Sequence, residues 1–71
     1  MIRMQQAREA RGLSRAGLAR QAEMSAATVG QIESGYIGKP YASQLAKLAA
    51  ALGWQRDPAD LLEDVGDNAH D

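Results

Sequence analysis

Across residues 13–33 the apolar positions follow a helical period twice, with a tight turn between the two segments. Leu18 and Ala22 fall on one face of the first segment, and Val29 and Ile32 fall on one face of the second. Helices this short are not stable alone in water, so these faces must pack on each other and on further helices. The pattern therefore predicts two short helices joined by a tight turn.

A serine precedes each of these two helices. The hydroxyls of Ser14 and Ser25 can each accept a hydrogen bond from a backbone N–H that has no partner within the helix. The outer face of the second helix, over residues 26–34, then carries only small or polar residues: Ala26, Ala27, Thr28, Gly30 and Gln31. A slim, uncharged face with basic flanks suits the major groove of DNA.

Three further segments have a helical pattern, so we expect an all-α fold of five helices. The first covers residues 2–11, and the fourth covers 41–52 after a loop marked by glycine and proline. The fifth is short, with Asp57 as its cap and Pro58 as its first residue. Its buried side would be formed by Leu61, Leu62 and Val65.

The chain has 71 residues and no cysteine, which allows one domain without disulfide support. We expect residues 1–65 to form this domain and residues 66–71 to be a flexible acidic tail. No segment has the roughly 20 consecutive apolar residues of a membrane span, and no signal peptide is evident. These features predict a soluble, cytoplasmic protein.

The net charge of −1 conceals an uneven distribution. Residues 1–47 carry seven Lys or Arg and three acidic residues, whereas residues 48–71 carry one Arg and six acidic residues. The basic part contains the helix suited to the major groove, as contact with phosphates requires. We expect the acidic part to face away from DNA.

An enzyme is the function class with least support. The one histidine, His70, lies in the expected tail, and no glycine-rich phosphate loop or metal-ligand spacing is present. We therefore assign no catalytic residue, no metal site and no cofactor, and we expect no small-molecule ligand.

Six short sequence elements together resemble the lambda-repressor-like helix-turn-helix family, which includes the phage Cro and CI repressors. The similarity extends over about residues 4–62. The elements are Arg-Gly-Leu-Ser at 11–14, Leu-Ala at 18–19, Met-Ser at 24–25, Ile-Glu-x-Gly at 32–35, Pro40, and Leu-Ala-x-x-Leu-Gly at 48–53. The resemblance implies a compact five-helix domain in which the second and third helices form the helix-turn-helix.

The resemblance also implies which side chains face DNA. The base-contacting positions are Ala26, Ala27, Thr28 and Gln31, of which Gln31 is the best reader because its amide can pair with adenine. The alternative for the two alanines is plain helix surface. The phosphate-contacting positions are Arg11, Arg15, Arg20, Ser25, Ser34, Tyr36 and Lys39.

Four other positions receive structural roles. Family members join the first and third helices by a buried ion pair, which implies a pair between Arg8 and Glu33; the alternative for Arg8 is a phosphate contact. Glu23 stands in the turn where relatives have glycine, at a cost of about 1 kcal/mol. Trp54 either covers the core or forms a dimer contact, and we expect the first.

The leading interpretation is a sequence-specific regulator of double-stranded DNA, a small Cro-like repressor of a bacterium or phage. It would act as a homodimer, formed in solution or only on DNA, that occludes an operator with half-sites about one helical turn apart. The alternative is a protein-interaction module of the same fold, such as an antitoxin subunit or adaptor that binds a protein partner.

Overall fold

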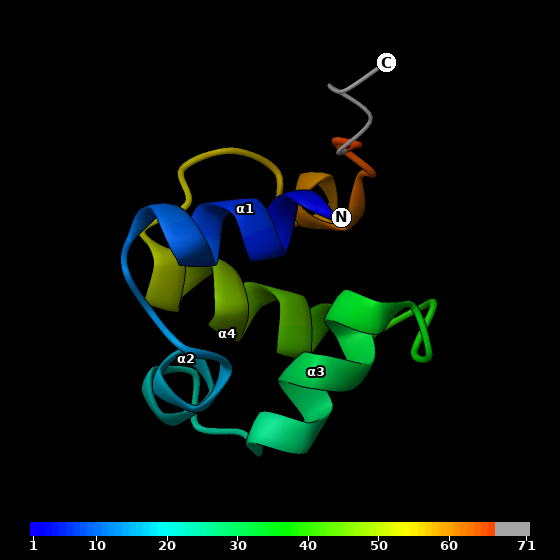
Figure 1. Ribbon diagram of the computed structural model, residues 1–71. Helices are drawn as coiled ribbons and strands as arrows, with labels where there is room; N and C mark the ends of the chain where they lie inside the picture. Colours follow the sequence, from blue (N-terminus) through cyan, green and yellow to red (C-terminus); the bar gives the residue numbers. More distant parts are fainter. Residues whose placement is uncertain (67–71) are drawn as a thin grey trace.

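The computed structural model describes residues 1–66, which form a compact all-helical arrangement (Figure 1). Within these residues there are four α-helices and one 3-10 helix. They are α1 (Arg3–Ala10), α2 (Arg15–Gln21), α3 (Ala26–Ser34), α4 (Ala42–Leu52) and η1 (Pro58–Leu62). The all-α class and the paired short helices are thus as expected. His70 and nearly all of the expected tail lie outside the described residues.

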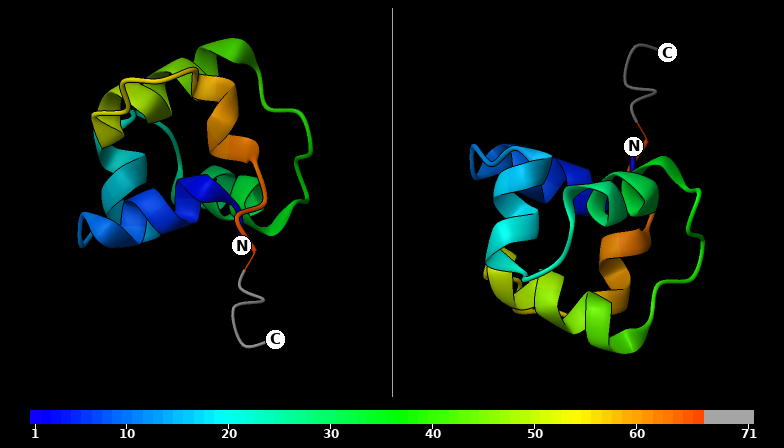
Figure 2. Two further views of the ribbon diagram at one scale, coloured as in Figure 1. Left: turned by 90° about the horizontal axis from the view of Figure 1, so that it is seen from above. Right: turned by 90° about the horizontal axis from the view of Figure 1, so that it is seen from below.

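The helices are arranged around α4, with α1 on one side of it and the α2–α3 pair on the other (Figure 1). α2 packs against both α3 and α4, and η1 packs against α1 and α4. Figure 2 shows the loop that joins α3 to α4 standing clear of the helices at one edge of the molecule. None of the described helices is both long and apolar enough to cross a lipid bilayer.

The expected fifth helix is present only as one short 3-10 helix over residues 58–62, so the described chain has four α-helices. Asp57 caps it as expected, by accepting a hydrogen bond from the Ala59 N–H at 3.0 Å. Glu63, directly after it, is extended, with φ −64° and ψ 138°, and its carbonyl accepts a hydrogen bond from the Arg3 N–H at 2.8 Å. The chain thus leaves the helical path directly after the fifth residue.

The core contains the apolar residues that the helical period predicts. The fully buried side chains come from all five elements and are Met4, Leu18, Val29, Ile32, Leu48 and Leu61. Trp54 is partly buried against this core. Tyr41, directly before α4, is 76% exposed.

Both serine caps are confirmed. The Ser14 hydroxyl accepts a hydrogen bond from the Gly17 N–H at 2.9 Å, and the Ser25 hydroxyl accepts one from the Thr28 N–H at 3.1 Å. α3 ends at Gly35, whose left-handed φ of 87° is open to glycine at no steric cost. The start of α2 and both ends of α3 are thereby fixed by local sequence.

One residue in the turn between α2 and α3 has a backbone conformation that is unfavourable for any residue other than glycine. Glu23 has a φ of 60°, which makes it the one non-glycine residue with a positive φ among residues 1–66. A side chain at such a φ costs about 1–2 kcal/mol, because its Cβ crowds the following carbonyl. The turn therefore keeps the left-handed geometry despite the absence of glycine.

Replacing Glu23 by glycine should stabilise the domain by about 0.5–1 kcal/mol, since the steric relief exceeds the added entropy of the unfolded chain. Urea denaturation would measure the free energy of unfolding. Gln21→Gly is the matched control at the last position of α2, where glycine should instead destabilise by about 1 kcal/mol. Equal effects of the two substitutions would contradict the strain at residue 23.

The two ends of the described chain are joined side by side. Ile2 and Asp64 form an antiparallel β-bridge, and the Val65 N–H donates to the Met1 carbonyl at 3.0 Å. Arg3 and Glu63 form an ion pair at 2.9 Å.

The Asp64 carboxylate accepts a hydrogen bond from the Gly66 N–H at 2.7 Å and lies 3.5 Å from the N-terminal amine. These two contacts lower the pKa of Asp64.

A lowered carboxyl pKa stabilises the folded state above the ordinary value of about 3.9, and the effect is lost as the pH falls through the folded-state pKa. Asp64→Asn should therefore reduce stability at neutral pH and have a progressively smaller effect on acidification below about pH 4. Urea denaturation of both proteins across this pH range would measure the difference. A pH-independent difference would contradict the role of this carboxylate.

Candidate nucleic-acid interface

α3 is anchored by one face and leaves the other accessible. Val29 and Ile32 are buried, with exposed fractions of 0% and 1%, whereas Ala26, Ala27 and Gln31 are exposed. The accessible face therefore carries two methyl groups and one flexible amide. Such a face is narrow and carries no acidic side chain that would repel DNA, and the major groove admits an α-helix.

The hydroxyls at the start of α3 are already paired with each other. The Ser25 and Thr28 side-chain oxygens lie 2.8 Å apart, and Ser25 also caps the helix through the Thr28 N–H. Thr28 is half-buried, so its methyl group is less accessible than those of the two alanines. The two hydroxyls together form a polar rim at the end of the accessible face.

Glu33 lies on the side of α3 that faces α1 and α2, and its side chain is 0% exposed. Arg8 of α1 binds it through two parallel hydrogen bonds, from Nε to Oε2 at 2.7 Å and from Nη2 to Oε1 at 3.1 Å. The same Arg8 donates from Nη1 to the Leu13 carbonyl at 2.7 Å. The structure thus brings together Arg8 and Glu33, the residues that the family resemblance pairs, and Arg8 also binds the loop before α2.

The ion pair keeps Arg8 charged despite its burial. The hydrogen bond with Glu33 and the negative charges of Glu33 and Glu9 raise the pKa of Arg8, and together they outweigh the lowering by desolvation. Glu9 approaches Arg8 Nη2 at 3.7 Å, with half of its side chain exposed. Arg8 is therefore buried and fully engaged, which leaves little of it for a phosphate.

Arg15 makes a contact that sequence reasoning missed. From the first position of α2, its Nε donates to Glu33 Oε1 at 3.0 Å, and half of its side chain remains exposed. The side chain passes over Gly30 of α3: a Cβ added there would lie 3.7 Å from Arg15 Nη1 and 3.8 Å from Cδ. Gly30, expected on the outer face, is instead half-buried beneath this arginine. The glycine in mid-helix was the available signal.

The other residues that were expected to contact DNA phosphates lie in two different parts of the structure. Ser34, Tyr36 and Lys39 are exposed at the end of α3 and in the loop that stands clear in Figure 2. The Ser34 hydroxyl donates to the Gln31 carbonyl at 3.2 Å, and Tyr36 is 82% exposed. These three side chains therefore lie at the C-terminal border of the α3 surface.

Arg11 and Arg20 have different surroundings. The Arg11 guanidinium lies at the end of α4, with Nη1 3.3 Å from where a Cβ on Gly53 would be. Figure 1 places this end of α4 on the opposite side of the molecule from the end of α3 and the loop after it. Arg20 is exposed on α2. The structure therefore does not bring Arg11 to the cluster of Ser34, Tyr36 and Lys39.

Trp54 is held within its own segment of chain. Its indole N–H donates to the Asp57 carbonyl at 3.0 Å, and the Arg56 guanidinium lies 5.1 Å above the ring. The inner part of the ring packs on the core. These contacts account for the position of Trp54 through the fold of a single chain.

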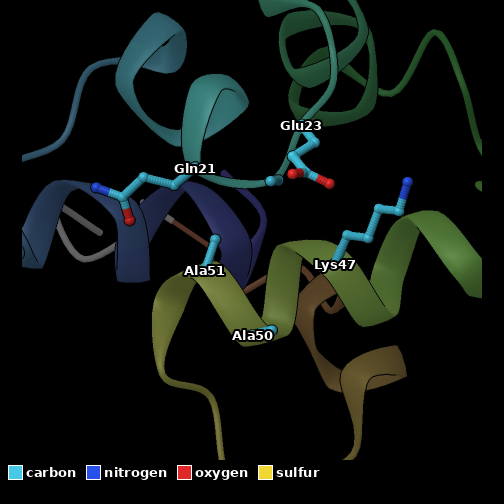
Figure 3. Close-up of a pocket in the computed structure, with 6 residues that line it drawn as sticks. Gln21, Glu23, Lys47, Ala50 and Ala51 are labelled. Carbon is cyan, nitrogen blue, oxygen red and sulfur yellow. The ribbon is translucent and has the colours of Figure 1, made fainter.

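A shallow groove lies between the end of α2 and α4 (Figure 3). It has a volume of about 350 Å³, and its lining residues are Gln21, Ala22, Glu23, Lys47, Ala50 and Ala51. In Figure 3 Glu23 and Lys47 lie on opposite sides of it. Within residues 1–66 no group of three or more His, Cys, Asp or Glu could hold a metal ion.

Comparison with known proteins gives one match. A family model described as a helix-turn-helix domain matches residues 2–62, which is most of the chain. No curated protein and no solved structure matches significantly. The match covers all five helical elements of the structure, including the α2–α3 pair.

Removing the Glu33 carboxylate should strongly destabilise the fold, because two arginines would lose their shared partner and one of them is buried. Glu33→Ala should lower the free energy of unfolding by about 3–5 kcal/mol. The control is Glu9→Ala, which removes the exposed carboxylate near Arg8 and should cost under about 1 kcal/mol. Thermal and urea unfolding would measure both, and similar losses would contradict the central role of Glu33.

Proposed function

Because this chain belongs to the helix-turn-helix domain family, we propose that it is a sequence-specific regulator of double-stranded DNA with α3 in the major groove. The finer form of the proposal is a small Cro-like repressor. It binds its operator and thereby blocks access of the polymerase or of a competing regulator.

The observation that carries this proposal is the accessible face of α3. Its exposed side chains are short or uncharged, while Val29, Ile32 and Glu33 hold the opposite side in the core. A helix mounted in this way can enter a groove without steric or electrostatic conflict. Gln31 reads adenine through its amide, and the methyl groups of Ala26 and Ala27 contact thymine methyls.

Phosphate contacts surround this face on two sides. Arg15 lies beside α3 from the α2 side, and the loop after α3 contributes Tyr36 and Lys39. The hydroxyls of Ser25 and Ser34 mark the two ends of α3, and Arg20 adds a charge on α2. Such contacts fix the register of the protein on the duplex without reading sequence.

Direct base readout by one glutamine and two or three methyl groups is sparse, so the shape of the DNA must contribute to specificity. A homodimer on two inverted half-sites would double the number of base contacts. We propose that the dimer forms in solution or on the operator, with half-sites about one helical turn apart.

The division between base and phosphate contacts gives distinct mutant phenotypes. Gln31→Ala should reduce the preference for the best site over its adenine-substituted variants by about 1–3 kcal/mol, and should change binding to random DNA little. Arg15→Ala should weaken binding to all sequences alike and reduce the slope of log affinity against log salt by about 0.9.

Fluorescence anisotropy with specific and random duplexes at several salt concentrations would separate the two phenotypes. Arg56→Ala is the matched control for the loss of charge, since Arg56 stacks on Trp54 in the segment before η1 and should not affect DNA affinity. Equal losses for Gln31→Ala and Arg15→Ala on both duplexes would contradict the proposed division.

The decisive experiment is selection of bound duplexes from a random pool, followed by affinity measurement for the selected sequence. An enriched inverted repeat, bound far more tightly than random DNA and weakened by salt, would support the repressor and reveal the half-site spacing. No enrichment, with weak binding that is insensitive to salt, would overturn the proposal and indicate a protein-binding role for the fold.

A further inference from the structure

We propose that Gly30 and Glu33 are positioning residues that hold the Arg15 guanidinium against the side of α3, where it binds a DNA phosphate adjacent to the groove. This inference rests on the proposed DNA-binding function and names two residues that would determine how one of its contacts is made. Neither residue need touch DNA itself.

The first step is the geometry of the arginine. Its Nε is bound to Glu33 Oε1 at 3.0 Å, which fixes one edge of the guanidinium against a side chain that is itself fully buried. Its Cδ and Nη1 pass over the Cα of Gly30. A long side chain that leaves α2 is thereby laid along α3, with half of it still accessible to solvent.

The second step is the charge of the cluster. Glu33 is shared by two arginines, and Arg8 binds it through two hydrogen bonds while Arg15 binds it through one. One buried carboxylate cannot neutralise two guanidinium groups. Arg8 is buried and has the nearby Glu9, so the uncompensated positive charge lies at the exposed member, Arg15. An anion approaching this side of α3 meets Arg15.

The third step is the need for a small residue at position 30. Glycine in the middle of a helix is unfavourable relative to alanine. The backbone does not require it, because the φ of Gly30 is not positive. Alanine would fit, since its Cβ would make ordinary contacts of 3.7 and 3.8 Å with Arg15. A longer side chain would occupy the space of the arginine, so the absence of one is what lets Arg15 reach Glu33.

The test compares Gly30→Ala with Gly30→Leu in the full chain. Both substitutions remove the glycine and favour the helix about equally. Gly30→Ala should therefore be at least as stable as the original, whereas in Gly30→Leu this gain is offset by loss of the Arg15–Glu33 hydrogen bond. Only leucine should displace Arg15. Hydrogen exchange of the Arg15 Nε–H, followed by NMR, reports the bond to Glu33 without any DNA: it should stay slow in Gly30→Ala and become fast in Gly30→Leu.

Binding to a random duplex gives the second readout. Gly30→Ala should bind as the original protein does, whereas Gly30→Leu should bind about ten-fold more weakly, with the salt slope reduced by about 0.9. Arg15→Ala should show the same loss, and adding Gly30→Leu to it should change nothing further. This non-additivity separates displacement of the arginine from a direct clash of leucine with DNA.

Each outcome has a defined meaning. A slow Arg15 Nε–H in Gly30→Leu, or an equal cost of Gly30→Leu with and without Arg15, would overturn the inference. Fast exchange with an unchanged salt slope would also overturn it, because the held guanidinium would then bind no phosphate. If the original protein itself shows no salt-dependent binding, the proposed function fails, and the exchange rates alone would still support positioning of Arg15 by Gly30 and Glu33.

Discussion

The buried carboxylate of Glu33 is the constraint on which the rest of this structure depends. A charge taken fully out of water must be paired, and the chain meets this need with guanidinium groups from two different helices. The partners come from α1 and α2, while the carboxylate belongs to α3. One side chain therefore fixes three helices relative to one another, which few apolar contacts in so small a core could do.

This arrangement explains how a domain with a thin core can present a rigid surface. Its largest fully buried side chains are aliphatic residues and Met4, one or two from each helix. Such contacts favour compactness more than orientation, because apolar packing has no direction. The hydrogen bonds of the Arg8–Glu33 pair have strict geometry, so the angle at which α3 faces outward is set by polar groups and its burial by apolar ones.

Much of this fold could be predicted from the sequence, because local rules govern it. The α3 bounds, the serine caps and the buried positions follow from helical periodicity and from side chains that bond their own helix start. That the last helix is a 3-10 helix of five residues could not be predicted. The residue that follows it, Glu63, pairs with Arg3, which lies sixty positions earlier in the sequence.

In the candidate site, likewise, single residues could be predicted from the sequence, but contacts between residues far apart in the sequence could not. The family resemblance pointed to Arg15, Gln31 and Lys39 individually, each with a role of its own. The passage of Arg15 over Gly30 to Glu33 involves residues 15 and 18 positions apart, and no periodic pattern encodes such a meeting. The mid-helix glycine marks the place, but only the packing of α2 on α3 shows what fills the space beside it.

The β-bridge between Ile2 and Asp64 has a consequence for how the domain opens. It closes a loop of almost the entire described chain, so its formation carries a large entropy cost, and it should be among the first contacts to separate. Met4 of α1 and Leu61 of η1 stay buried in the core when the bridge separates, and Arg8 keeps its bonds to Glu33. Opening of the bridge would therefore release the two chain ends without breaking the ion pair that orients α3.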